Sequence, residues 1–360
     1  MIISKIFKFI SIAIFIVLFS SISIGQNNYN LDSIKTEYNK SNDDYEKLNS
    51  INWLVFYEYG KIDSSIKYFK VAEKEFKIRK YIFGEAYVNR TLAIVYQSYH
   101  LNDSAIKHYK ASIKLFESIK NDTMIAKTCS NLGFVYYSQG DYDKSIEVYF
   151  LGLKFAKNST DYFTYAWLHN QIGLSYSNKP NPNYKLALEY YMKSLDILKK
   201  NNFISRSGLV HLRIGSVYLR QKNDSKGLYY LNKALKIGKD YNNKTVVLWT
   251  QVAFAKYYID HNQYNKAIEL ENYCVKQFIS GFDVPGIIDS YKNLANCNHK
   301  LNNNKLALIQ IDSAIYYSIN NNVYEKFNKI YELKSDIHKA LGQYDLAFEY
   351  FKKSVHVKDS

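Results

Sequence analysis

The side chains that could bind a metal ion or attack a substrate are scattered along this chain of 360 residues. None of its histidines belongs to an HExxH pair of metal ligands, and the chain has neither a GxSxG nucleophile motif nor a glycine-rich phosphate loop. Neighbouring carboxylates such as Asp43 and Asp44 would point to different sides of a helix instead of forming a catalytic pair. We therefore expect no enzyme, no cofactor and no metal site. The eight histidines are His100, His108, His169, His211, His261, His299, His338 and His356.

The three cysteines, Cys129, Cys274 and Cys297, form no CxxC pair, and their odd number argues against a disulfide framework. Each lies where a small buried helical residue would serve, which is the role we expect. A single disulfide between Cys274 and Cys297 is the alternative, because the two would lie on neighbouring helices of an exported protein.

Composition narrows the class of protein. The formal net charge of +15 is compatible with nucleic-acid binding, but the basic residues are spread along the whole chain. We therefore expect no nucleic-acid partner and only a weak preference for acidic partners. A hydrophobic content of 47% excludes a disordered chain, and only 3 Pro and 14 Gly favour long helices.

The elements that position these residues repeat along the sequence. Gly133 and Ser145 are small residues twelve positions apart, and they let two antiparallel helices approach. The same step recurs at Ala93 and Ala105, Gly215 and Gly227, Ala255 and Ala267, Ala295 and Ala307, and Ser335 and Ala347. It is longer from Gly173 to Ala187, where Pro180 and Pro182 extend the turn, and is degraded at Trp53 and Ser65. The first small sites lie at positions 53, 93, 133, 173, 215, 255, 295 and 335, a regular period with one slightly longer step at the proline insertion.

Residues between the helices support this pattern. Gly140 suits the left-handed conformation that ends a helix, and Asp141 can accept hydrogen bonds from the amides that start the next one. We expect Pro180, Pro182 and Pro285 to lie between helices. The recurring aromatic residues, such as Tyr136 and Tyr149, are interpreted as core filler.

The motif LGxxYxxxGxYxxSIxxY at residues 132–149, with ALGQYDLAFEYF at residues 340–351, resembles the tetratricopeptide repeat in a long form, with a period of about 40 residues. The resemblance covers about residues 46–357. It implies an all-α, right-handed superhelical solenoid of about eight antiparallel helix pairs. It also implies a concave groove, lined by the first helix of each pair, that binds a protein or peptide.

The family's geometry places ligand-facing side chains one and four residues after each first small site, and six and three before it. Lys292 and Asn296 resemble half of the family's clamp for a terminal carboxylate, although Glu332 departs from that clamp and Lys292 is otherwise a solvated lysine. Trp167 and Trp249 have an alternative role, in which they cover helix ends. The candidates are Tyr87, Arg90, Phe134, Tyr137, Trp167, Asn170, Arg213, Trp249, Lys256, Lys292 and Asn296.

Residues 1–25 have the pattern of a secretory signal peptide. Lys5 and Lys8 precede the apolar run 9–19, and the small residues Ser23 and Gly25 suit cleavage before Gln26. An uncleaved membrane anchor is the alternative, because the apolar character continues to Ile24. Residues 26–45 are predicted to be a capping helix or linker, and residues 46–360 the solenoid. We therefore expect a periplasmic or extracellular protein whose only membrane contact is the leader.

These features predict a non-enzymatic scaffold that binds a protein or peptide in the cell envelope. The alternative is the sensor segment of a signal-transduction protein, because the chain resembles the exported repeat segment of bacterial histidine kinases and transcriptional regulators. Their membrane and output parts would then be absent or encoded separately. The last helix, about residues 344–357, is expected to leave one face uncovered, which favours a continuation of the array or a homodimer over a free monomer.

Overall fold

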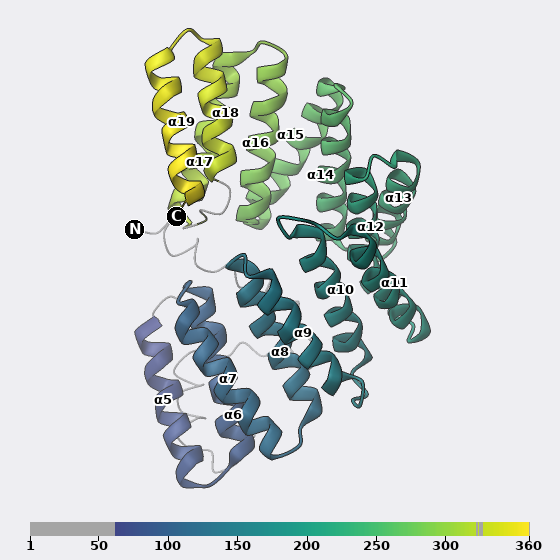
Figure 1. The fold of residues 1–360 in the computed structure, drawn as a ribbon, viewed down its shortest axis with the longest axis vertical. Coiled ribbons are helices and arrows are strands. Elements are labelled where there is room, and N and C mark those ends of the chain that lie inside the picture. The colour runs from purple at the N-terminus through teal and green to yellow at the C-terminus, as the bar shows by residue number, and fades with distance from the viewer. Residues whose placement is uncertain (1–61, 322, 324–326, 360) are drawn as a thin grey trace. The chain divides into compact units, whose positions relative to one another are not determined.

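The computed structural model describes residues 62–321, 323 and 327–359, and it divides the chain into two compact units at Arg206 and Ser207. Every regular element assigned in these residues is a helix (Figure 1). The predicted leader, the capping segment 26–45 and the first helix of the first repeat lie outside the described residues. Unit 1 contains α5 (Ile62–Ile78), α6 (Ile82–Ser98), α7 (Asn102–Ser118), α8 (Asp122–Ser138), α9 (Tyr142–Ala156), α10 (Tyr162–Asn178), α11 (Tyr184–Lys200) and the 3-10 turn η1 (Ile204–Arg206). Unit 2 contains α12 (Ser207–Arg220), α13 (Asp224–Asp240), α14 (Lys244–Asp260), α15 (Tyr264–Gly281), α16 (Val284–Lys300), α17 (Asn304–Asn320), α18 (Phe327–Ala340) and α19 (Tyr344–Asp359).

The even-numbered helices from α6 to α18 are the first helices of the predicted repeats, and the odd-numbered helices from α5 to α19 are the second helices. Small residues let the two helices of a hairpin approach, as the spacing predicts. A methyl group on Gly133 would lie 2.3 Å from Cε1 of Tyr149, which is fully buried on the facing helix. A methyl group on Gly173 would lie 2.9 Å from the carbonyl oxygen of Ala187. The paired small positions are therefore confirmed as helix contacts.

The turns between helices use a left-handed residue. Gly140 has a φ of +78°, and Asp141 caps α9 by accepting a hydrogen bond from the Lys144 amide at 3.2 Å, both as predicted. Most other turns place a residue with a side chain in this conformation, for example Lys120 at φ 53°. The prediction for Pro285 is wrong, since this residue lies in the first turn of α16, where a missing amide hydrogen breaks no helical bond.

The contacts between helices define an inner side in each unit. Consecutive first helices touch one another, with α6 against α8 and α8 against α10 in unit 1. In unit 2, α12 touches α14, α14 touches α16 and α16 touches α18. The described second helices make no comparable contact with one another. Elements on the inside of a curved stack lie closer together than those on the outside, so each unit bends toward its first helices. We call the side of a unit that the first helices line its first-helix face.

Cys129, Cys274 and Cys297 are buried free thiols, so the expected small-residue role is observed and the alternative disulfide is not. Burial raises the pKa of each thiol to about 12, which leaves it protonated and unreactive at neutral pH. Within the described residues, no helix combines the length and apolar character needed to cross a bilayer.

Candidate binding surfaces on the first helices

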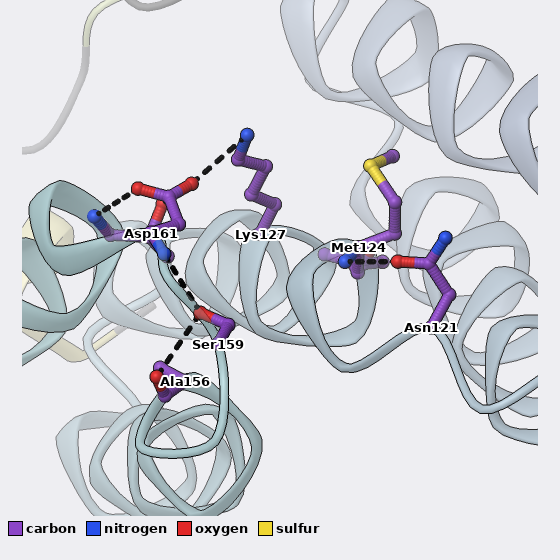
Figure 2. A network of polar contacts seen from close by, with 8 residues as sticks. Asn121, Met124, Lys127, Ala156, Ser159 and Asp161 are labelled. Atoms are coloured by element: carbon purple, nitrogen blue, oxygen red, sulfur yellow. Dashed lines mark hydrogen bonds and ion pairs between the residues drawn. The ribbon is translucent and has the colours of Figure 1, made fainter.

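Polar contacts at the helix starts position the first helices of unit 1 (Figure 2). The Asn121 side chain caps α8 by accepting a hydrogen bond from the Met124 amide at 3.1 Å. Asp161 caps α10 through the Thr164 amide at 2.9 Å, and its second oxygen pairs with Lys127 of α8 at 3.0 Å. Burial alone would raise the pKa of Asp161, but its bonds to Thr164 and Lys127 hold that pKa below its ordinary value. The ionised carboxylate therefore links α8 to α10.

The predicted aromatic candidates in unit 1 form a surface on α8. Phe134 is 42% exposed, and its ring stacks on Tyr137 with centroids 6.2 Å apart. Tyr137 makes an edge contact with Tyr142 at 5.4 Å, and its hydroxyl oxygen accepts a hydrogen bond from the Asn178 side chain at 2.6 Å. The Phe134 ring is thus held in place while part of it remains open to solvent. An apolar group of a ligand could pack on this ring.

The other candidates in unit 1 are less accessible. Tyr87 and Trp167 are half-buried, and each stacks on an aromatic residue one turn earlier, Phe83 and Phe163 respectively. Arg90 is buried, and desolvation lowers its pKa. Asn170 is fully buried, and its side-chain amide has no hydrogen-bond partner among the described residues. Arg90 and Asn170 therefore lie beneath the first-helix face and do not present their side chains on it.

In unit 2, four cations cross the first-helix face, one from each first helix: Arg220 of α12, Lys256 of α14, Lys292 of α16 and Lys329 of α18. We call this set the cationic line. Lys256 is exposed, yet desolvation by the surrounding protein lowers its pKa, and the other three cations lower it further. The other three cations are close enough to act on Lys256, so together the four would attract an anion more strongly than a single lysine would.

Carboxylates offset the cationic line only in part. Asp289 pairs with Lys292 at 3.0 Å, and Asp260 opposes the lowering of the Lys256 pKa. Among the described residues, neither Lys256 nor Lys329 has a carboxylate within ion-pair distance. These two amines are therefore the strongest candidates to contact an acidic group.

The remaining candidates in unit 2 are placed as follows. Asn296 of α16 is half-buried. The indole Nε1 of Trp249 donates a hydrogen bond to Asp283 at 3.1 Å, and its ring lies 5.4 Å from that of Phe278. Trp249 therefore packs over the α15–α16 turn, the alternative role foreseen for it. Arg213 of α12 lies two residues before Gly215, outside the phase that the other candidates share.

Lys329 and Arg220 were not among the predicted residues. Lys329 lies six residues before Ser335 and so meets the spacing rule, whereas Arg220 lies five residues after Gly215 and does not. A separate signal is present in the sequence, because the four cations are 36, 36 and 37 residues apart. This step is about one helical turn shorter than the repeat, so each cation lies one turn earlier on the next first helix. No cluster of three or more His, Cys, Asp or Glu side chains in the described part of the chain could hold a metal ion.

The curved stacks of antiparallel helical hairpins, with side chains displayed along the inner helices, define a helical repeat scaffold. The model of the tetratricopeptide repeat matches residues 126–158 and 329–358, so the chain contains tetratricopeptide repeats. A comparison with curated protein sequences gave no significant match.

Solved structures share this fold at low sequence identity. The apo quorum sensor NprR from B. thuringiensis is 14% identical with a TM-score of 0.63, over 91% of this chain and 92% of that one. A Rap protein in complex with competence and sporulation factor is 12% identical with a TM-score of 0.60, over 81% and 79% of the two chains. A Signal Transduction ATPase with Numerous Domains protein with a tetratricopeptide repeat sensor, from Pyrococcus horikoshii, is 19% identical with a TM-score of 0.57, over 91% of this chain. This chain spans about half of that protein's length, 49%.

Proposed function

We propose that this protein is a non-enzymatic scaffold of the cell envelope that binds an acidic segment of a protein or peptide on the first-helix face of unit 2. The cationic line carries this proposal. Its four cations come from four consecutive first helices, so an extended ligand could contact all of them in turn. On unit 1, the exposed Phe134 ring offers an apolar contact to a protein or peptide ligand. Folds built from tetratricopeptide repeats are typically non-catalytic scaffolds.

Binding of a fluorescein-labelled oligoglutamate peptide, followed by fluorescence anisotropy, tests the site. Replacing both Lys256 and Lys329 with alanine should weaken binding about tenfold, because each removes a charge pair worth about 0.5–1 kcal/mol. The matched control replaces Lys236 and Lys276, two exposed lysines on second helices, and should leave affinity unchanged. Equal losses in both variants would show that diffuse charge, and not the cationic line, attracts the peptide. Tighter binding of polyuridylate RNA, with the same dependence on Lys256 and Lys329, would replace the protein partner with a nucleic acid.

Location in the envelope is part of the proposal, and it rests on the leader-like pattern of residues 1–25. Expression of the full chain in a bacterial host, followed by fractionation and amino-terminal sequencing, tests it. We expect a periplasmic protein that starts at Gln26. Recovery of a chain starting at Met1 in the membrane fraction would establish the uncleaved anchor, and recovery in the cytosol would contradict export.

A second candidate function is a sensor segment of a signalling system. The descriptions of similar structures favour it, since they include a quorum sensor, a tetratricopeptide repeat sensor and a complex with a sporulation factor. Hydrogen exchange with and without the oligoglutamate peptide separates the two functions. A sensor should show altered exchange far from the ligand, whereas a plain scaffold should show protection only along the first helices of unit 2.

A further inference from the structure

The second helices of unit 2 share a pattern of burial that is broken in α19. The pattern concerns the positions one, four and eight residues after the small residue of each second helix, which is Gly227 in α13, Ala267 in α15 and Ala307 in α17. The middle position is fully buried at Leu231, Glu271 and Ile311. The flanking positions are half-buried or buried at Leu228 and Leu235, Ile268 and Val275, and Leu308 and Ile315. In α17, for example, these side chains pack with Phe327 and Ile330 of α18, the next first helix.

The corresponding residues of α19 are large, apolar and exposed. Phe348 is 62% exposed, Phe351 54% and Val355 43%. By contrast, Ala347 and Ser354 of the same helix are buried, so α19 packs on α18 normally. No described helix covers the face that Phe348, Phe351 and Val355 present.

Tyr344, which is 68% exposed, extends these residues into a continuous stripe. The steps from Tyr344 to Phe348, Phe351 and Val355 are four, three and four residues, which is the spacing of a helix-pairing seam. We call these four residues the α19 seam. Scattered exposed apolar residues need no explanation, whereas a stripe with this spacing indicates a surface that packs against a helix.

The charges beside the α19 seam identify the helix that fits it. Asp345 and Glu349 lie toward the start of α19, while Lys352 and Lys353 lie toward its end. Lys352 lies directly beside the seam, with its Nζ 4.7 Å from the centre of the Phe348 ring. Asp345 is seven residues earlier and therefore lies on the same side of the helix. This order of charges is complementary to itself only when one copy is reversed.

We propose that the α19 seam binds the α19 seam of a second copy of this protein, with the two helices antiparallel. A twofold axis midway along the seam places Phe348 against Phe351 of the second copy, and Tyr344 against Val355. Asp345 then lies beside Lys352 of the second copy, and the reciprocal pair forms by symmetry. A parallel pair would instead place Asp345 and Lys352 of the two copies on opposite sides of the interface, where they could not pair. This inference is independent of the proposed function, because the seam belongs to a second helix and not to the first-helix faces.

Sedimentation velocity over a range of protein concentrations tests the dimer. The wild-type protein should pass from monomer to dimer, and replacing Phe348 and Phe351 with glutamate should raise the dissociation constant at least about 100-fold. Both residues are exposed, so circular dichroism should remain unchanged. The matched control replaces Ile309 and Tyr316 of α17, which are 64% and 63% exposed, with glutamate and should dimerise normally. A wild-type monomer at every concentration would overturn the proposal, as would an equal loss of dimer in both variants.

Cysteine cross-linking tests the orientation, because the three natural cysteines are buried. An antiparallel pair predicts that Asp345→Cys and Lys352→Cys proteins form a mixed disulfide dimer when combined under mild oxidation, and that neither protein links to itself efficiently. A dimer that forms no mixed disulfide, or efficient self-linking of either protein alone, would refute the antiparallel pairing. Binding to lipid vesicles with no protein dimer, lost in Phe348→Glu, would show that a membrane and not a second copy covers the seam.

Discussion

Glu271 provides a quantitative test of the packing in unit 2. It occupies the position that is Leu231 in the preceding repeat and Ile311 in the following one, and it is fully buried. Its Oε1 accepts a hydrogen bond of 2.6 Å from the Asn293 side chain. Burial raises the pKa of this carboxyl to about 7, because water no longer solvates the charge.

The charged groups around Glu271 belong to α16. The Asn293 hydrogen bond, the nearby Ser290 hydroxyl and Lys292 lower the pKa without cancelling the effect of burial, and Asp289 raises it further. A pKa that rises from 4.5 to about 7 corresponds to about 3 kcal/mol of folding free energy. The folded protein holds this proton more tightly than the unfolded chain does. The stabilisation is therefore complete below about pH 4.5, falls as the pH rises, and is lost above about pH 7.

Replacing Glu271 with glutamine removes this titration but keeps an oxygen that can accept the Asn293 hydrogen bond. At pH 8 the variant should be more stable than the wild type by about 3 kcal/mol, and near pH 5 by much less. Urea unfolding followed by the fluorescence of Trp249 measures this difference, with Trp53 and Trp167 replaced by phenylalanine in every protein compared. Glu269→Gln, an exposed neighbour on α15, is the control and should show no such difference. If Glu271→Gln and the wild type keep the same stability difference from pH 5 to pH 8, the carboxyl does not titrate as a buried group, and the reasoning fails.

Two further substitutions test the hairpins by thermal unfolding. Gly133→Ala should destabilise unit 1 by about 1–3 kcal/mol, because the added methyl group meets the buried Tyr149 ring. The control is Gly281→Ala, whose methyl group would have no atom within 4 Å. This control should be neutral or slightly stabilising. Equal effects of the two would mean that the close approach at Gly133 is absent. Lys120→Gly should stabilise the protein by about 1 kcal/mol, because glycine adopts the left-handed turn at φ 53° without strain. The control is Lys114→Gly in the middle of α7, which should destabilise the protein by about 1 kcal/mol. A destabilised Lys120→Gly protein would show that its turn is unstrained or held by the lysine side chain.

The sequence predicted the hairpins well because their rule is local. A small residue must face a large one wherever two helices touch. Residues of the same types as Gly133 and Tyr149 therefore recur from repeat to repeat at a nearly constant spacing. The family's geometry placed Phe134 and Tyr137 on the groove surface, and the structure leaves Phe134 exposed and Tyr137 half-buried. The same geometry placed Arg90 and Asn170 on that surface too, because it gives the direction of a side chain around its own helix but not the depth at which neighbouring first helices enclose it.

The fold class, the repeat period and the order of small and large positions were thus readable from the residues alone, since each depends on contacts within one hairpin. Tertiary structure decided which polar groups are buried and which charges meet. Glu271 looks like any helical glutamate until α15 and α16 enclose it. The cationic line and the α19 seam likewise depend on which helix stacks on which. Burial and electrostatic fields depend on atoms from several helices at once, so residues 36 or 37 positions apart in the chain become neighbours only in the folded stack.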